Sequence, residues 1–124
     1  YIDLLAAMPC VALDDDFVFV HAGLNMDLPD PITETSRDCM LWGDSQQADI
    51  TRLGGRRLVT GHVIASLAQV RASLQGSRIY LDNGAYKNSP PEYGNLLALN
   101  LDTMELTCQP WLDDYAEMLQ YSMY

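Results

Sequence analysis

Four consecutive apolar residues at positions 17–20, Phe-Val-Phe-Val, constrain the fold more than any other feature of this sequence. A strand with one solvated face alternates apolar and polar residues, whereas an unbroken apolar run is typical of a strand buried on both faces. Residues 57–60 and residues 77–81 are two further β-rich runs. The chain is therefore predicted to build a sheet covered on both sides, as in a parallel or sandwich core.

Helical and turn patterns surround these strands. Apolar residues recur at helical spacing in four segments: residues 2–8, residues 46–53, residues 63–74 and the stretch after Pro110. Turn-forming residues dominate three others: residues 14–16, the longer surface loop at 25–38, and residues 82–84, which close the third strand. Residues 96–101 and 105–109 flank a short turn and predict a β-hairpin. The expected fold class is α/β, a mixed sheet with flanking helices.

The charge balance excludes several classes of partner. The 124 residues include 7 Lys and Arg against 17 Asp and Glu, which gives a formal net charge of −10. Nucleic acids and anionic membranes attract basic surfaces, so neither a nucleic acid nor a membrane is expected as a partner. The 3 cysteines are widely spaced and match neither a disulfide framework nor a zinc motif. These features predict one domain with reduced thiols in the cytoplasm.

The chain has only 2 histidines, and each follows a predicted strand. His21 follows residues 17–20 and precedes two small residues, whereas His62 follows residues 57–60 and Gly61. In α/β sheets, functional groups gather just past the carboxyl ends of strands, and small neighbours let a ligand approach closely. Imidazole is the most common protein ligand for transition metals, but a lone histidine at a strand end is often structural. Two ligands do not complete a catalytic metal site, so both interpretations stay open.

Five segments add to this pattern when they are taken in order. They are Phe-Val-Phe-Val-His-Ala-Gly-Leu at 17–24, Leu-Trp at 41–42, Leu-Val-Thr-Gly-His at 58–62, Arg-Ile-Tyr-Leu-Asp-Asn-Gly-Ala at 78–85 and Gly-Asn-Leu-Leu-Ala-Leu at 94–99. In this order they resemble the C-terminal half of a calcineurin-like metallophosphoesterase, most closely the bacterial serine/threonine protein phosphatase branch. The resemblance spans nearly all of the chain. It implies that residues 1–124 are the C-terminal portion of an α/β/β/α sandwich.

The resemblance also implies a function. It implies that the protein is a metal-dependent phosphoester hydrolase, most nearly a serine/threonine protein phosphatase, and that its partner is a phosphorylated substrate. In that family the two matching histidines bind the second of two divalent metal ions, so His21 and His62 are the implied metal ligands. Mn²⁺ is the implied metal, with Fe, Zn or Ni as alternatives. Two other functions stay open: a dinucleoside tetraphosphate hydrolase of the same fold, and a non-catalytic module that binds a partner.

The sequence departs from the family pattern in its metal ligands. The motifs Gly-Asp-x-His-Gly, Gly-Asp-x-x-Asp-Arg-Gly and Gly-Asn-His-Glu do not occur. We therefore expect that the N-terminal metal-binding half is absent and that the chain alone is a poor metal binder and catalytically silent. Such a half-domain exposes a sheet face, which predicts self-association.

A second departure concerns the phosphate. Gly43-Asp44 stands where the bacterial branch carries an Arg behind Leu-Trp, and Asp44 is the implied catalytic residue, bordering the phosphate without binding metal. Arg52, Arg56 or Arg57 is a candidate phosphate clamp, against the alternative that each belongs to a solvated basic patch.

Overall fold

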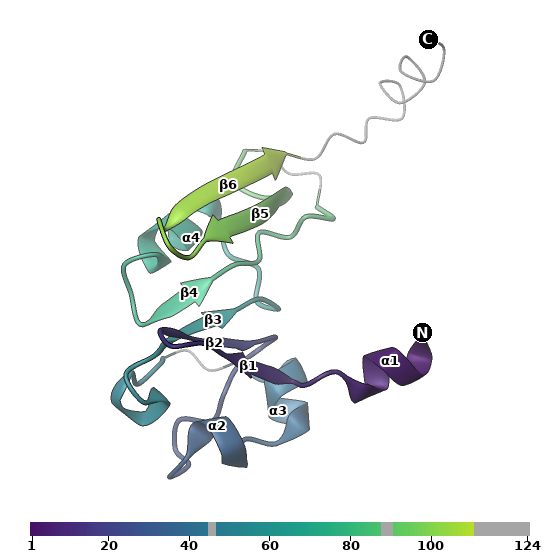
Figure 1. Cartoon of the computed structure of the whole chain (residues 1–124). Coiled ribbons are helices and arrows are strands. Elements are labelled where there is room, and N and C mark those ends of the chain that lie inside the picture. The colour runs from purple at the N-terminus through teal and green to yellow at the C-terminus, as the bar shows by residue number, and fades with distance from the viewer. Residues whose placement is uncertain (45–46, 88–90, 111–124) are drawn as a thin grey trace.

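The computed structural model describes residues 1–44, 47–87 and 91–110 of the chain. The elements follow the order α1 (Ile2–Ala7), β1 (Val11–Leu13), β2 (Phe17–Val20), α2 (Pro31–Glu34), α3 (Arg37–Trp42), η1 (Thr51–Leu53), β3 (Arg57–Thr60), α4 (Leu67–Ser73), β4 (Arg78–Tyr80), β5 (Asn95–Asn100) and β6 (Glu105–Pro110). Figure 1 shows a central sheet with α2 and α3 on one side and the β5–β6 hairpin with α4 on the other. This arrangement confirms the predicted α/β class.

The central sheet has four strands in the order β1-β2-β3-β4. Strands β2, β3 and β4 run parallel, and β1 pairs antiparallel with β2 at the edge. The register aligns Val18 with Leu58 and Arg78, and Val20 with Thr60. Because the three inner strands are parallel, their carboxyl ends meet at one edge of the sheet, and the residues that follow them are brought together there.

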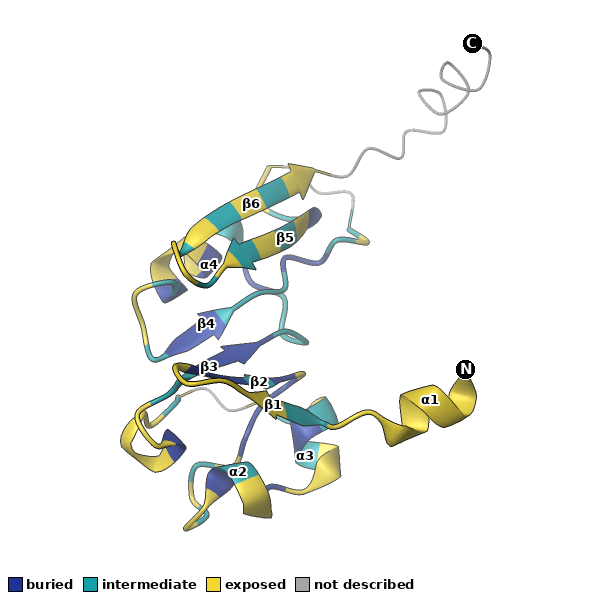
Figure 2. Cartoon of the chain, in the orientation of Figure 1, coloured by how far each residue is buried: buried dark blue, intermediate teal, exposed yellow. Residues whose placement is uncertain are grey.

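Both faces of the sheet are covered, which explains the apolar run at residues 17–20. Val18, Val20 and Leu58 form one core cluster with the buried Leu24, Met40 and Leu53. Phe17, Val59 and Ile79 form a second cluster on the opposite face, against Leu74 and the hairpin residues Leu99, Leu101 and Met104. Figure 2 shows the inner strands as the most buried part of the chain and α1 as fully exposed. The prediction of a strand buried on both faces is confirmed for β2.

Local capping explains where the predicted loops and helices were wrong. Residues 25–38 were expected to be a loop, but α2 forms there because Asp30 accepts hydrogen bonds from the backbone of Ile32 and Thr33 and because Pro31 opens the helix. The helix expected at residues 63–74 begins only at Leu67, after the Ser66 N-cap. That cap is a reciprocal capping box with Gln69, which fixes the start of α4.

Two other expectations differ from the structure in extent. The helix expected at residues 46–53 is only the short η1, since residues 47–49 are not helical and Asp49 accepts from the Thr51 N–H in a turn. The helix ends at Gly54, as expected, with this glycine in the left-handed region.

The short strand β1 was not predicted. The turn at residues 14–16 is confirmed by two backbone N–H groups that donate to Asp14. The helix expected after Pro110 lies outside the described residues.

The hairpin and the turn at residues 82–84 are as expected. Strands β5 and β6 pair antiparallel, with Asn95 opposite Pro110 and Asn100 opposite Glu105. Asp82 Oδ1 accepts from the Gly84 N–H at 2.8 Å, which closes the turn after β4. In the described part of the chain, no helix is both long enough and apolar enough to cross a membrane.

Candidate functional site

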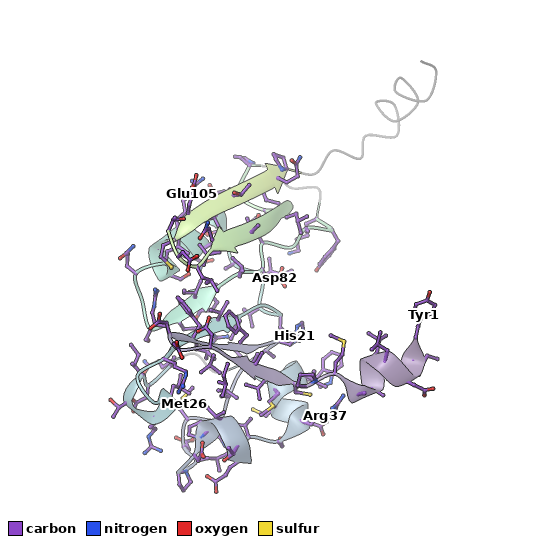
Figure 3. The ribbon with its side chains drawn as sticks, viewed as in Figure 1. Tyr1, His21, Met26, Arg37, Asp82 and Glu105 are labelled. Atoms are coloured by element: carbon purple, nitrogen blue, oxygen red, sulfur yellow. The ribbon has the colours of Figure 1, made fainter. Side chains whose placement is uncertain are left out.

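The structure brings the two histidines together. Their ring centroids are 5.0 Å apart, with the rings at 63° to each other. This proximity follows from the sheet, because β2 and β3 are parallel neighbours and each histidine lies just past a carboxyl end. A hydrogen bond from the Gly61 N–H to the His21 carbonyl, 2.9 Å long, continues the pairing beyond the strands. His21 and Asp82 both lie at this edge of the sheet (Figure 3).

The backbone at His62 has an uncommon conformation. Its φ is 64°, in the left-handed region that residues with a Cβ seldom occupy. The Val63 N–H donates to the Gly61 carbonyl at 2.7 Å, which closes a three-residue turn around His62. Such a conformation costs about 1–3 kcal/mol and persists only where the surroundings impose it. The turn holds the His62 ring over the end of the sheet, next to His21.

Trp42, the last residue of α3, extends this ring cluster. Its indole lies edge-on to the His62 imidazole, with centroids 5.8 Å apart and an interplanar angle of 82°. Trp42 is 73% exposed, so most of the residue's surface is open to solvent. A hydrogen bond from the Ala22 N–H to the Met40 carbonyl, 2.8 Å long, ties the segment after His21 to α3. The three rings therefore lie on segments that are joined through the backbone.

Asp44 lies at the same end of the molecule and is ion-paired. Its Oδ1 accepts from Arg78 Nη1 at 3.2 Å, and its side chain is 47% exposed. The carboxylate is thus positioned by a cation from β4 while one side of it stays in water. The structure therefore places Asp44 beside the strand ends, where Arg78 also donates to the Ala22 carbonyl.

Arg78 connects the segments of the candidate site, although the sequence motifs gave it no role of its own. Its side chain is 3% exposed and joins three segments, because Nε donates to Thr60 Oγ1, Nη1 to Asp44 and Nη2 to the Ala22 carbonyl. Its guanidinium also lies over the Tyr80 ring, 4.6 Å from the centroid. Ala22 directly follows His21, and Thr60 lies two positions before His62. The sequence signal was an arginine within a buried strand, a place where an unpaired cation is too costly.

The three arginines considered as phosphate clamps are used elsewhere. Arg52 Nη1 donates to the Leu28 carbonyl and Arg56 Nε to the Asp14 carbonyl. Arg57 bonds the carbonyls at positions 74 and 76. Arg57 also begins β3, so a strand of about 13 Å separates it from the histidine edge. These contacts support turns and strand starts, and Arg52, which also pairs with Asp49, is 44% exposed, as the solvated-patch alternative expects.

The donor set fits a metal ion in part. Two imidazoles at one edge suit a transition metal, but they fill at most two positions of its coordination sphere. Within residues 1–44, 47–87 and 91–110, no group of three or more His, Cys, Asp or Glu side chains could hold a metal ion. The described residues therefore do not supply a complete site, and any further ligands must come from elsewhere.

Two hollows adjoin the histidine edge. One, of about 480 Å³, lies between α1 and the sheet and is lined by His21, Gly61 and the exposed Arg37. The other, of about 770 Å³, runs from Asp44 and Val63 along α4. His21 and Gly61 line the first hollow, and Val63, which directly follows His62, lines the second.

Comparison of the chain with protein-family models, with curated proteins and with solved structures gave no match.

Proposed function

We propose that the chain is the C-terminal part of a calcineurin-like metallophosphoesterase sandwich and that the whole domain hydrolyses phosphoesters, with phosphoserine or phosphothreonine in a protein as substrate. The observation that carries this proposal is the 5.0 Å approach of the His21 and His62 rings past two parallel strands. The order of the sequence motifs adds support, because the same two histidines are the ones that the family pattern matches.

In this proposal His21 and His62 hold one divalent cation, Mn²⁺ by preference, and the remaining ligands lie outside residues 1–124. Bound metal ions of this kind stabilise charge on a phosphoryl group and activate water. Asp44 borders the phosphate, and its pairing with Arg78 keeps the carboxylate at the strand ends. The positive φ at His62 supports the proposal as well, because strained backbone at a strand end is a mark of functional positions.

The experiment compares the 1–124 chain with a longer polypeptide that carries the sequence upstream of Tyr1. Both are assayed with Mn²⁺ on p-nitrophenyl phosphate, a phosphoserine peptide and diadenosine tetraphosphate. We expect turnover of the first two substrates by the longer polypeptide and none by the 1–124 chain. Comparable turnover by the 1–124 chain overturns the assignment of missing ligands, and preference for diadenosine tetraphosphate favours the other hydrolase of this fold.

We also propose self-association, but through α1 and not through the sheet face expected from the sequence, because both faces of the four-stranded sheet are covered. Within the described residues, apolar exposure gathers on α1 and its flank, where Ile2 is 82%, Leu4 66% and Leu5 63% exposed. Light scattering of the 1–124 chain tests this prediction, with a dimer or larger species expected. We also place the protein in the cytoplasm, which the free thiols of Cys10, Cys39 and Cys108 support.

A further inference from the structure

The larger hollow beside Asp44 has the form of a binding cleft. We call it the α4 cleft. It has a volume of about 770 Å³, and its lining includes Asp44, Gln47, Ile64, Gln69, Ala72 and Tyr80. Volumes of this order are typical of sites that hold a small ligand or a short peptide. The cleft begins at Asp44 and at Val63, which directly follows His62, so it leads away from the histidine edge.

The lining of the α4 cleft suits polypeptide. Ile64, Ala65 and Ala72 supply apolar surface, and Gln47 and Gln69 supply side-chain amides. A peptide brings backbone N–H and C=O groups that need partners when they leave water, and an amide side chain both donates and accepts. Gln69 Oε1 accepts from the Ser66 N–H in the α4 capping box, and the amide nitrogen of Gln69 takes no part in that box.

The charges of the cleft speak against a polyanion. Among the described residues that line it, Arg78 is the only cation and Asp44 the only anion. The Arg78 side chain is 3% exposed and donates to Thr60, Asp44 and the Ala22 carbonyl, so its charge is already compensated inside the protein. The chain as a whole carries a net charge of −10. An incoming chain of phosphates would meet a protein of net negative charge, and the described part of the lining offers it no free cation.

We propose that the α4 cleft binds the polypeptide segment next to the phosphorylated residue of a protein substrate, and that this segment carries neutral or basic side chains. The inference rests on the proposed function and narrows it, because it selects a phosphoprotein over a dinucleoside polyphosphate. Basic side chains in the segment gain from the chain's net charge of −10, and acidic ones are repelled by it.

The test measures binding to the 1–124 chain by fluorescence anisotropy, which needs no catalysis. The probes are a labelled phosphoserine peptide flanked by arginines, the same peptide with glutamates in their place, and unlabelled diadenosine tetraphosphate as a competitor. Ala72→Trp fills the cleft from an exposed position on α4, and Ala68→Trp is the matched control, exposed on the same helix but outside the lining. Circular dichroism establishes that both variants keep the fold.

We expect the arginine peptide to bind, its affinity to fall about tenfold or more in Ala72→Trp, and Ala68→Trp to match the parent. The glutamate peptide should bind more weakly, and diadenosine tetraphosphate should not compete. Equal binding by Ala72→Trp and the parent, equal binding of both peptides, or competition by the nucleotide overturns the inference. If the peptide binds in the α4 cleft but the longer polypeptide does not hydrolyse p-nitrophenyl phosphate, the binding site is supported and the proposed hydrolase activity is contradicted. Failure of the cleft proposal and failure of the proposed function therefore give different results.

Discussion

His21 and His62 lie with their ring centroids 5.0 Å apart, although each belongs to a different strand-end segment. The parallel pairing of β2 with β3 produces this approach, and the hydrogen bond between the Gly61 N–H and the His21 carbonyl fixes it. Trp42 packs edge-on against the second ring. The pair therefore depends on the sheet and is held from α3 as well.

The backbone strain at His62 gives a stability prediction. At a φ of 64°, glycine is unstrained whereas alanine pays the Cβ penalty of the left-handed region. Both His62→Gly and His62→Ala lose the same imidazole contacts. We expect His62→Gly to be more stable than His62→Ala by about 1 kcal/mol, measured by urea unfolding. A more stable alanine variant would show that the turn relaxes and that no strain is stored there.

Arg78 is expected to stabilise the strand ends more than any exposed arginine. Arg78→Met leaves the buried Thr60 hydroxyl and the Ala22 carbonyl without this donor, at a cost of about 2–3 kcal/mol. Asp44→Ala removes a half-exposed partner and leaves the other two acceptors of Arg78 in place, so it should cost less than Arg78→Met. Arg71→Met, at an exposed position of α4, is the control and should change stability by less than about 0.5 kcal/mol. Equal losses in all three variants would argue against a network centred on Arg78.

Asp44 should affect catalysis without affecting metal content. Asp44→Asn keeps the side-chain shape and an acceptor for Arg78 but removes the charge that borders the proposed phosphate position. We expect the longer polypeptide with this change to lose turnover while elemental analysis finds the parent's metal content. Loss of one metal equivalent would assign Asp44 to the metal instead.

Much of the fold could be predicted from the sequence, because the buried strands are visible there as apolar runs. The runs at residues 17–20 and 57–60 became β2 and β3, and the pattern at residues 96–101 became β5 with a small shift of its ends. The start of α4 and the presence of α2 could not be read from apolar spacing, since capping hydrogen bonds decide both. The periodicity of apolar residues indicates which residues are buried, but it does not reveal the capping hydrogen bonds that determine where a helix begins.

The candidate site could likewise be predicted only in part from the sequence. The matching contexts of His21 and His62 were visible in the sequence, and the parallel sheet explains why they meet. Arg78 was placed in a strand but given no role, since its partners Asp44, Thr60 and the Ala22 carbonyl come together only in three dimensions. For each of Arg52, Arg56 and Arg57, a carbonyl partner could not be predicted for the same reason, because it lies 19 or more residues away in the sequence.

Asp30 gives a prediction for acid stability. The pKa of its carboxyl is lowered from 3.8, first by a hydrogen bond from the Thr33 side chain and further by the backbone N–H groups of Thr33 and Ile32. A lowered pKa in the folded state stabilises the protein above 3.8, and this contribution is lost as the pH falls through the folded value. Asp30→Asn keeps a cap that does not titrate, so its stability should fall less below that pH. Identical acid unfolding curves would show that the cap does not couple to folding.

The most direct test of the proposed site is a double-mutant cycle on the two histidines in the longer polypeptide. The measured quantity is kcat/KM for p-nitrophenyl phosphate with Mn²⁺, for the parent, His21→Ala, His62→Ala and the double variant. Ligands of one cation act as a unit, so we expect each single change to lower kcat/KM by about 100-fold or more and the double change to lower it little further. Full activity in His62→Ala, or a double variant whose loss equals the product of the two single losses, would mean that these histidines do not share a metal ion.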